Sequence, residues 1–126
     1  MFMRYLHKHH KREHLLSEAE SELHDFQEYL HKFYSGIQVA GMTVVFTEGR
    51  ADDMIVNAVN GSEADCVLSV LSSPLQEEFI VKNRNLLNLR IWMNLGKEFI
   101  PVCKKKTKQK WFKKIIVKRI LKKEID

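Results

Sequence analysis

Apolar residues recur every three or four positions between residues 16 and 33, which is the pattern of an amphipathic helix. These positions are Leu16, Ala19, Leu23, Phe26, Leu30 and Phe33. Ser17 and Glu20 have the spacing of a capping box, and Ser35-Gly36 is a typical stop signal. The sequence therefore predicts a helix that begins at Ser17 and ends before Ser35.

Three further segments are apolar almost throughout, which is typical of strands buried on both faces in a parallel sheet. They are residues 37–46, 66–71 and 89–95. Two short helical patterns, residues 51–60 and 75–83, separate them. Elements that alternate in this way predict parallel strands joined by right-handed crossovers. The sequence thus predicts an α/β fold with a small three- to four-stranded, mostly parallel, Rossmann-like sheet flanked by helices.

The pattern changes after the third strand. Residues 98–103 are apolar but include Pro101, which favours an edge strand or a loop. Residues 104–126 hold eleven Lys or Arg and two acids, a net charge of +9, so the rest of the chain carries −4 of the total +5. Within them, residues 111–123 predict a basic amphipathic helix. We therefore divide the chain into a basic His-rich leader (1–16), an α/β domain (17–103) and a basic amphipathic tail (104–126).

The basic tail predicts a negatively charged partner. A basic helix with Trp and Phe can lie on an anionic membrane, where each basic residue contributes about 1 kcal/mol. The residues for this contact are Lys110, Trp111, Phe112, Lys113, Lys114 and Lys118. An equally favoured alternative is that the aromatic residues pack on the domain and the lysines face water. Nucleic-acid binding is not expected, because no recognised module accompanies the charge.

The two cysteines, Cys66 and Cys103, lie in apolar stretches, so we expect buried free thiols and a reducing compartment. Residues 1–14 lack the apolar core of a signal peptide. No segment approaches the roughly 18 to 20 apolar residues of a spanning helix. These features predict a cytoplasmic protein, and the membrane interpretation of the tail would place it peripherally at the inner face of the membrane.

Two groups of residues have the composition of a metal or catalytic site. His7, His10 and His14 share a helical face and could bind zinc, but the interleaved basic residues favour a solvated leader. Asp52 and Asp53 open a predicted helix, where they are expected to stabilise its dipole. We therefore predict no metal site from either group.

Residues 65–77 carry the clearest functional signal. A buried strand runs into a tight turn, and the next helix opens with Pro-x-Gln-Glu. Ligands of α/β sheets bind outside the carboxyl ends of the strands, and free N–H groups at a helix start favour an anion such as a diphosphate. Structure alone also explains the pattern, because Ser73 and Gln76 are spaced as a capping box with Pro74 between them.

This segment resembles the glycosyltransferase family often called WecG/TagA/CpsF. In that family an Asp-opened strand leads through a Gly-x-Gly turn into Pro-Lys-Gln-Glu, which is similar to residues 65–77. The next helix of the family contains an Asn-Arg pair, matched by Asn83-Arg84. A Gly-Gly-x-Phe-Asp segment follows, which resembles residues 96–100. The resemblance covers about residues 23–100.

Several positions depart from the family pattern. Val70 and Ser72 stand where the family has its two turn glycines, and Leu75 stands where it has lysine. Lys97 replaces the second glycine of the later segment, and Ile100 replaces its aspartate. The N-terminal half of the family, with its proposed catalytic aspartate, finds no counterpart. We therefore predict no catalytic residue in this chain.

The resemblance implies a uridine-diphosphate-sugar site, and we predict no cofactor and no metal ion. The implied binding residues are Ser72, Ser73, Pro74, Gln76, Glu77, Gly96 and Phe99. We expect a truncated or degenerate glycosyltransferase, related to the UDP-N-acetylmannosamine transferases of cell-wall or surface polysaccharide synthesis. Such a chain would be weak or inactive alone, and a homo-oligomer is one way to complete it. The alternative is a non-catalytic membrane-surface or protein-interaction module that uses the basic tail.

Overall fold

The structure is a computed structural model, and it describes five stretches of the chain: residues 2–45, 52–73, 75–89, 91–105 and 119–120. Helices and strands alternate along these stretches. The helices are α1 (Phe2–Lys8), α2 (Glu20–Phe33), α3 (Asp52–Gly61), α4 (Leu75–Asn83) and α5 (Phe99–Lys105). The strands are β1 (Arg12–Ser17), β2 (Gln38–Val44), β3 (Cys66–Ser69), β4 (Ile91–Asn94) and β5 (Arg119–Ile120).

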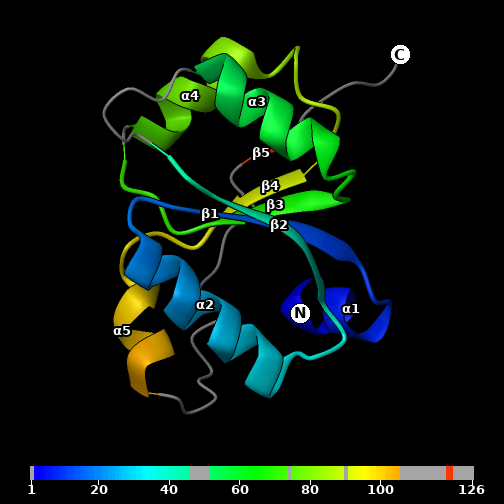
Figure 1. Ribbon diagram of the computed structural model, residues 1–126, viewed down its shortest axis with the longest axis vertical. Coiled ribbons are helices and arrows are strands. Elements are labelled where there is room, and N and C mark those ends of the chain that lie inside the picture. The colour runs from blue at the N-terminus through cyan, green and yellow to red at the C-terminus, as the bar shows by residue number, and fades with distance from the viewer. Residues whose placement is uncertain (1, 46–51, 74, 90, 106–118, 121–126) are drawn as a thin grey trace.

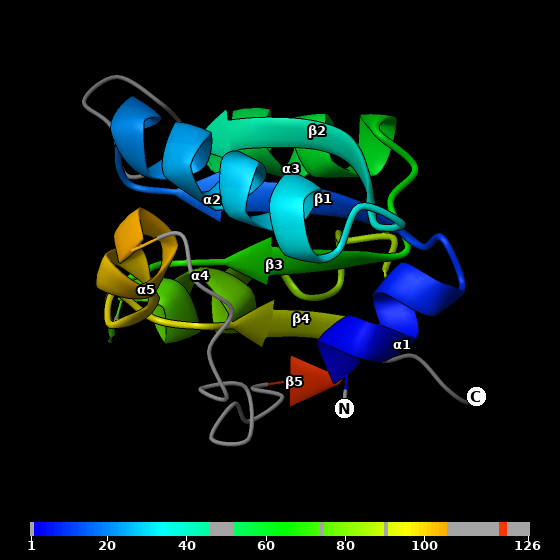
Figure 2. The same ribbon diagram turned by 90° about the horizontal axis from the view of Figure 1, so that it is seen from below.

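The strands form one sheet in the order β2-β1-β3-β4-β5. The first four are parallel, and the two-residue β5 pairs antiparallel with β4. Helices α1, α2 and α5 cover one face of the sheet, and α3 and α4 cover the other (Figures 1 and 2). The predicted α/β fold, with a mostly parallel sheet flanked by helices, is confirmed.

Two apolar cores hold these layers together, one on each face of the sheet. The first packs α1, α2 and α5 against the sheet, with Phe26 and Phe99 fully buried in it. The second packs α3 and α4 around Trp92, which is also fully buried. Both cysteines are buried free thiols, as predicted. None of the helices in the described ranges has the length and apolar character needed to cross a bilayer.

Strand β1, an interior strand of the sheet, is the main departure from the sequence analysis. It occupies Arg12–Ser17, mostly within the stretch interpreted as a His-rich leader, and pairs with β2 on one side and β3 on the other. The predicted helix start at Ser17 is wrong, because α2 begins at Glu20 and Ala19 is its N-cap. The Ser17 hydroxyl donates to the Ala19 carbonyl at 2.6 Å instead of capping the helix.

The histidines of the leader also differ from the expected solvated group. His14 is only 2 % exposed, and its ring nitrogens contact Thr43 Oγ1 at 2.7 Å and Ser62 Oγ at 3.0 Å. Burial lowers the pKa of His14 to about 4. His7 Nδ1 accepts a hydrogen bond from the Gly36 N–H at 2.7 Å. Within the described stretches, no group of three His, Cys, Asp or Glu side chains is placed to hold a metal ion.

Three predictions near the C-terminus either are wrong or concern residues outside those that the structure describes. Residues 98–103 were expected as an edge strand or loop, but α5 is a helix. Pro101 lies in its first turn, where the missing N–H has no helical acceptor to lose. The structure has strand β5 at Arg119–Ile120, where a helix was expected. The six residues predicted to contact a membrane, from Lys110 to Lys118, lie outside the described residues.

Candidate functional site

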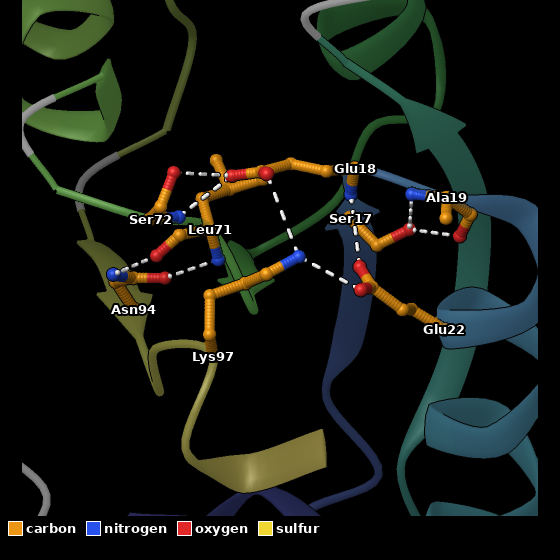
Figure 3. Close-up of polar contacts among 8 residues, drawn as sticks. All are labelled: Ser17, Glu18, Ala19, Glu22, Leu71, Ser72, Asn94 and Lys97. Atoms are coloured by element: carbon orange, nitrogen blue, oxygen red, sulfur yellow. Dashed lines mark hydrogen bonds and ion pairs between the residues drawn. The ribbon is translucent and has the colours of Figure 1, made fainter.

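The turns that follow β1, β3 and β4 meet at the carboxyl edge of the sheet. The parallel register sets Leu16 beside Ser69, and Ser69 beside Asn94, so the three chains leave the sheet side by side. Glu18 follows β1, Ser72 follows β3 and Lys97 follows β4 (Figure 3). We call Glu18, Ser72 and Lys97, together with Glu22 of α2, the edge cluster.

Asn94 fixes the shape of the turn after β3. Its Oδ1 accepts hydrogen bonds from Ser69 Oγ at 2.8 Å and the Leu71 N–H at 3.0 Å, and its Nδ2 donates to the Leu71 carbonyl at 3.0 Å. Trp92 Nε1 in turn donates to Ser69 Oγ at 2.9 Å. Because these groups are buried, each hydrogen bond satisfies a polar group that would otherwise have no partner. The backbone of the turn is therefore held in one position.

The edge cluster gathers hydrogen-bond donors around a carboxylate. Glu18 Oε2 accepts from the Ser72 N–H at 2.7 Å and from Ser72 Oγ at 2.8 Å. Lys97 Nζ lies 3.4 Å from Glu18 Oε1 and 2.7 Å from Glu22 Oε2. Figure 3 shows the Glu18 side chain reaching across the edge to Ser72, with Lys97 between the two acids. The donors form a cradle for an anion, and Glu18 occupies it.

The ionisation of the edge cluster follows from these contacts. Burial raises the pKa of Glu18, but the two Ser72 hydrogen bonds and the Lys97 charge outweigh it, so the pKa is lowered overall. Burial lowers the pKa of Lys97, and the Glu22 hydrogen bond and Glu18 charge more than reverse this. Both groups are therefore charged at neutral pH. An ionised carboxylate whose lone pairs already accept strong hydrogen bonds is a poor proton acceptor.

The residues predicted to bind the ligand are spread over this edge and the core below it. Ser72 is in the edge cluster, and Gly96 lies next to Lys97 with φ of +79°. Ser73 Oγ donates to Glu77 Oε2 at 3.0 Å at the start of α4. Phe99 is fully buried and packs edge-on against Tyr29, with ring centroids 5.2 Å apart. Pro74 lies outside the described residues.

Gln76 carries a buried and unsatisfied amide. The residue is 0 % exposed, and neither its Nε2 nor its Oε1 has a hydrogen-bond partner among the residues that the structure describes. The predicted capping box with Ser73 is therefore not formed. An unsatisfied buried amide costs about 1–3 kcal/mol, and native proteins satisfy such groups with a ligand or an ordered water.

Asn83, from the matched Asn-Arg pair, and Asp52, from the acidic pair, contact each other and join two helices. Asn83 Nδ2 donates to Asp52 Oδ2 at 3.1 Å and to the Phe79 carbonyl at 3.0 Å. Lys82 Nζ lies 3.5 Å from the same Asp52 oxygen. These contacts tie the start of α3 to the end of α4, on the face of the sheet that carries both helices. Asp52 thus links two helices, besides lying in the first turn of α3.

Sequence reasoning did not identify Glu18 or Asn94. Asn94 has a weak signal, since it is a polar residue at the end of an otherwise apolar strand. Glu18 has none, because it lies beside a strand that the sequence analysis did not predict. Its contact with Ser72 joins residues 54 positions apart.

A parallel α/β sheet with polar strand-to-helix turns gathered at its carboxyl edge is the arrangement of nucleotide-binding α/β proteins. The chain matches the sequence model of the family described as "Glycosyl transferase WecG/TagA/CpsF family" over residues 1–115, and it belongs to that family. The resemblance noted over residues 23–100 is confirmed, and the match also includes α1 and β1. A search of the curated proteins finds no match.

Proposed function

We propose that the chain binds the diphosphate of a UDP-sugar at the carboxyl edge of its sheet and transfers sugar weakly or not at all when alone. The observation that supports this is the edge cluster, in which the Ser72 N–H, the Ser72 hydroxyl and Lys97 Nζ all lie close to one carboxylate. These donors suit phosphate oxygens equally well. Membership of a glycosyltransferase family suggests a sugar nucleotide as the anion.

Other residues of the edge complete the proposed site. The Gln76 amide is unsatisfied but fully buried, so it would reach a uracil or a sugar hydroxyl only after the side chains that cover it have moved. Gly96 has a positive φ that lets the backbone of its turn adopt a shape disfavoured for other residues. Lys97 contributes the positive charge. Ser73 and Glu77 flank these groups at the start of α4.

The weak activity follows from the carboxylates available at the edge. Sugar transfer needs a base within about 3 Å of the acceptor hydroxyl. Glu18 and Glu22 both contact Lys97, and the Glu18 pKa is lowered. Glu13 has a proton affinity suited to a base, but it pairs in register with Cys66, at the opposite, amino end of the strands. Neither acid of the edge cluster is therefore a poised base.

Calorimetric titration of the full chain with UDP tests the binding half of this proposal. We expect heat of binding, and Ser72→Ala should weaken the affinity about tenfold because it removes one donor to the anion. Ser35→Ala, at an exposed serine after α2, is the matched control and should bind as the unmodified chain does. Absence of binding at millimolar UDP would contradict the proposed site.

A turnover assay tests the second half. The chain is incubated with UDP-N-acetylmannosamine and a lipid-linked acceptor, and UDP release is measured. We expect release far below the rate of about 1–1,000 per second that is typical of enzymes. Release within that range by the chain alone would show that the claim of weak activity is wrong.

A further inference from the structure

We propose that Glu18 is an internal competing anion that gates the edge site, so that a diphosphate binds only after the Glu18 carboxylate has left Ser72. The inference rests on the proposed function and adds a specificity-determining residue to it. Glu18 lies in the short turn between β1 and α2, outside both elements.

The contacts of Glu18 are those that a phosphate group would make. One oxygen takes both Ser72 donors, at 2.7 and 2.8 Å, and the other faces the Lys97 ammonium at 3.4 Å. The Ser72 bonds have the lengths of charge-assisted hydrogen bonds. A phosphate oxygen cannot use the same N–H and hydroxyl while the carboxylate holds them. Binding of one anion therefore excludes the other.

The geometry also allows Glu18 to leave without unfolding the edge. Its backbone N–H donates to Glu22 Oε1 at 3.3 Å, which holds the turn independently of the Glu18 side chain. Glu22 contacts Lys97 at 2.7 Å, so the ammonium keeps a partner when the Glu18 carboxylate moves away. A change of side-chain rotamer at Glu18 is then sufficient to open the cradle.

Charge adds to the steric competition. With Glu18, Glu22 and Lys97 all ionised, these three side chains carry a net charge of −1, which repels a diphosphate. Neutralising Glu18 brings this local charge to zero. A side chain tethered at its own site competes at an effective concentration of millimolar or more. We therefore expect Glu18→Ala to bind a diphosphate at least about tenfold more tightly than the unmodified chain.

The test compares four proteins by calorimetry: the unmodified chain, Glu18→Ala, Glu18→Gln and Glu20→Gln. Glu20→Gln is the matched control, because Glu20 is exposed in the first turn of α2 and its loss changes the net charge by the same amount. The probes are inorganic pyrophosphate, which carries only the anion, and UDP. We expect Glu18→Ala to gain affinity for both probes, Glu18→Gln to gain less, and Glu20→Gln to match the unmodified chain.

The possible outcomes distinguish the proposed Glu18 gate from the proposed nucleotide site. A gain for pyrophosphate without any binding of UDP supports the gate and contradicts the proposed function. UDP binding that is equal in the unmodified chain and Glu18→Ala supports the proposed function and overturns the gate. An equal gain in Glu20→Gln also overturns it, since the effect would then be one of overall charge. No binding of either probe to any variant overturns both proposals.

Discussion

Replacing Glu13 with Gln removes a buried carboxyl group from strand β1, and the new side chain has nearly the same size as the old one. Glu13 is 0 % exposed, and its Oε1 accepts a hydrogen bond from Cys66 Sγ at 2.5 Å. Its Oε2 has no partner among the described residues. The pKa of Glu13 is raised to about 8, mainly by burial and in smaller part by the Asp65 charge, against the lowering effect of the Cys66 hydrogen bond. The folded protein therefore holds a proton on Glu13 at neutral pH.

The sign of the pH dependence follows from proton linkage. The pKa of Glu13 is about 8 in the folded protein and 4.5 in its ordinary, unburied state, so its contribution to stability is complete below pH 4.5 and is lost as pH rises through 8. Between pH 6.5 and 8 the free energy of unfolding should fall by about 1.5 kcal/mol. His14 has the opposite effect on the free energy of unfolding, which it makes rise with pH. Because the pKa of His14 is lowered to about 4, this effect is confined to the range below pH 6.5.

Urea denaturation at half-unit steps from pH 6.5 to 8 measures this effect. The unmodified chain should lose stability over that range, and Glu13→Gln should lose about 1.5 kcal/mol less. Glu78→Gln, at an exposed side chain of α4, is the matched control and should follow the unmodified chain. Parallel pH profiles for the unmodified chain and Glu13→Gln would refute the argument that Glu13 is protonated in the fold.

Three further predictions concern the edge and the tail. Asn94→Ala should lower the free energy of unfolding by about 2–3 kcal/mol in urea denaturation, because it leaves buried groups of Leu71 unsatisfied; a loss below 0.5 kcal/mol would contradict the role given to Asn94. Gly96→Ala should lower the free energy of unfolding by about 1–2 kcal/mol, because an alanine is strained at the φ of +79° that Gly96 adopts. An unchanged thermal midpoint would count against strain at this residue. Flotation with anionic liposomes should recover the full chain but not a chain lacking residues 104–126, and equal recovery of both would exclude the predicted membrane contact.

The elements that could be predicted from the sequence are those with a continuous apolar segment or a helical pattern, although β2 lies at the edge of the sheet and is only partly buried, not buried on both faces as expected. Strands β2, β3 and β4 and helices α3 and α4 all lie where the apolar segments and helical patterns indicated. Strand β1 could not be predicted because it begins with Arg12, Glu13 and His14, which usually lie on a surface. Glu13 and His14 are nevertheless buried, and their partners, Cys66 and Thr43, lie far along the chain. Helix α5 was missed because Pro101 counts against a helix unless it lies in the first turn.

The candidate site was predictable only in part for the same reason. The turn at Ser72 and the glycine at residue 96 follow strands that the pattern revealed. The contact of Glu18 with Ser72 depends on β1 lying between β2 and β3, and this order is not the order of the chain. The unsatisfied amide of Gln76 depends on how α4 packs, which spacing does not determine. Which charged groups lie close together at the edge could therefore be learned only from the three-dimensional structure.

A crystal structure of the full chain grown with millimolar UDP would test most directly whether the carboxyl edge of the sheet is a nucleotide site. The account predicts a diphosphate oxygen within about 3 Å of the Ser72 N–H, with the Glu18 carboxylate moved off Ser72. UDP bound elsewhere on the protein, or an edge where Glu18 still holds both Ser72 donors, would contradict it.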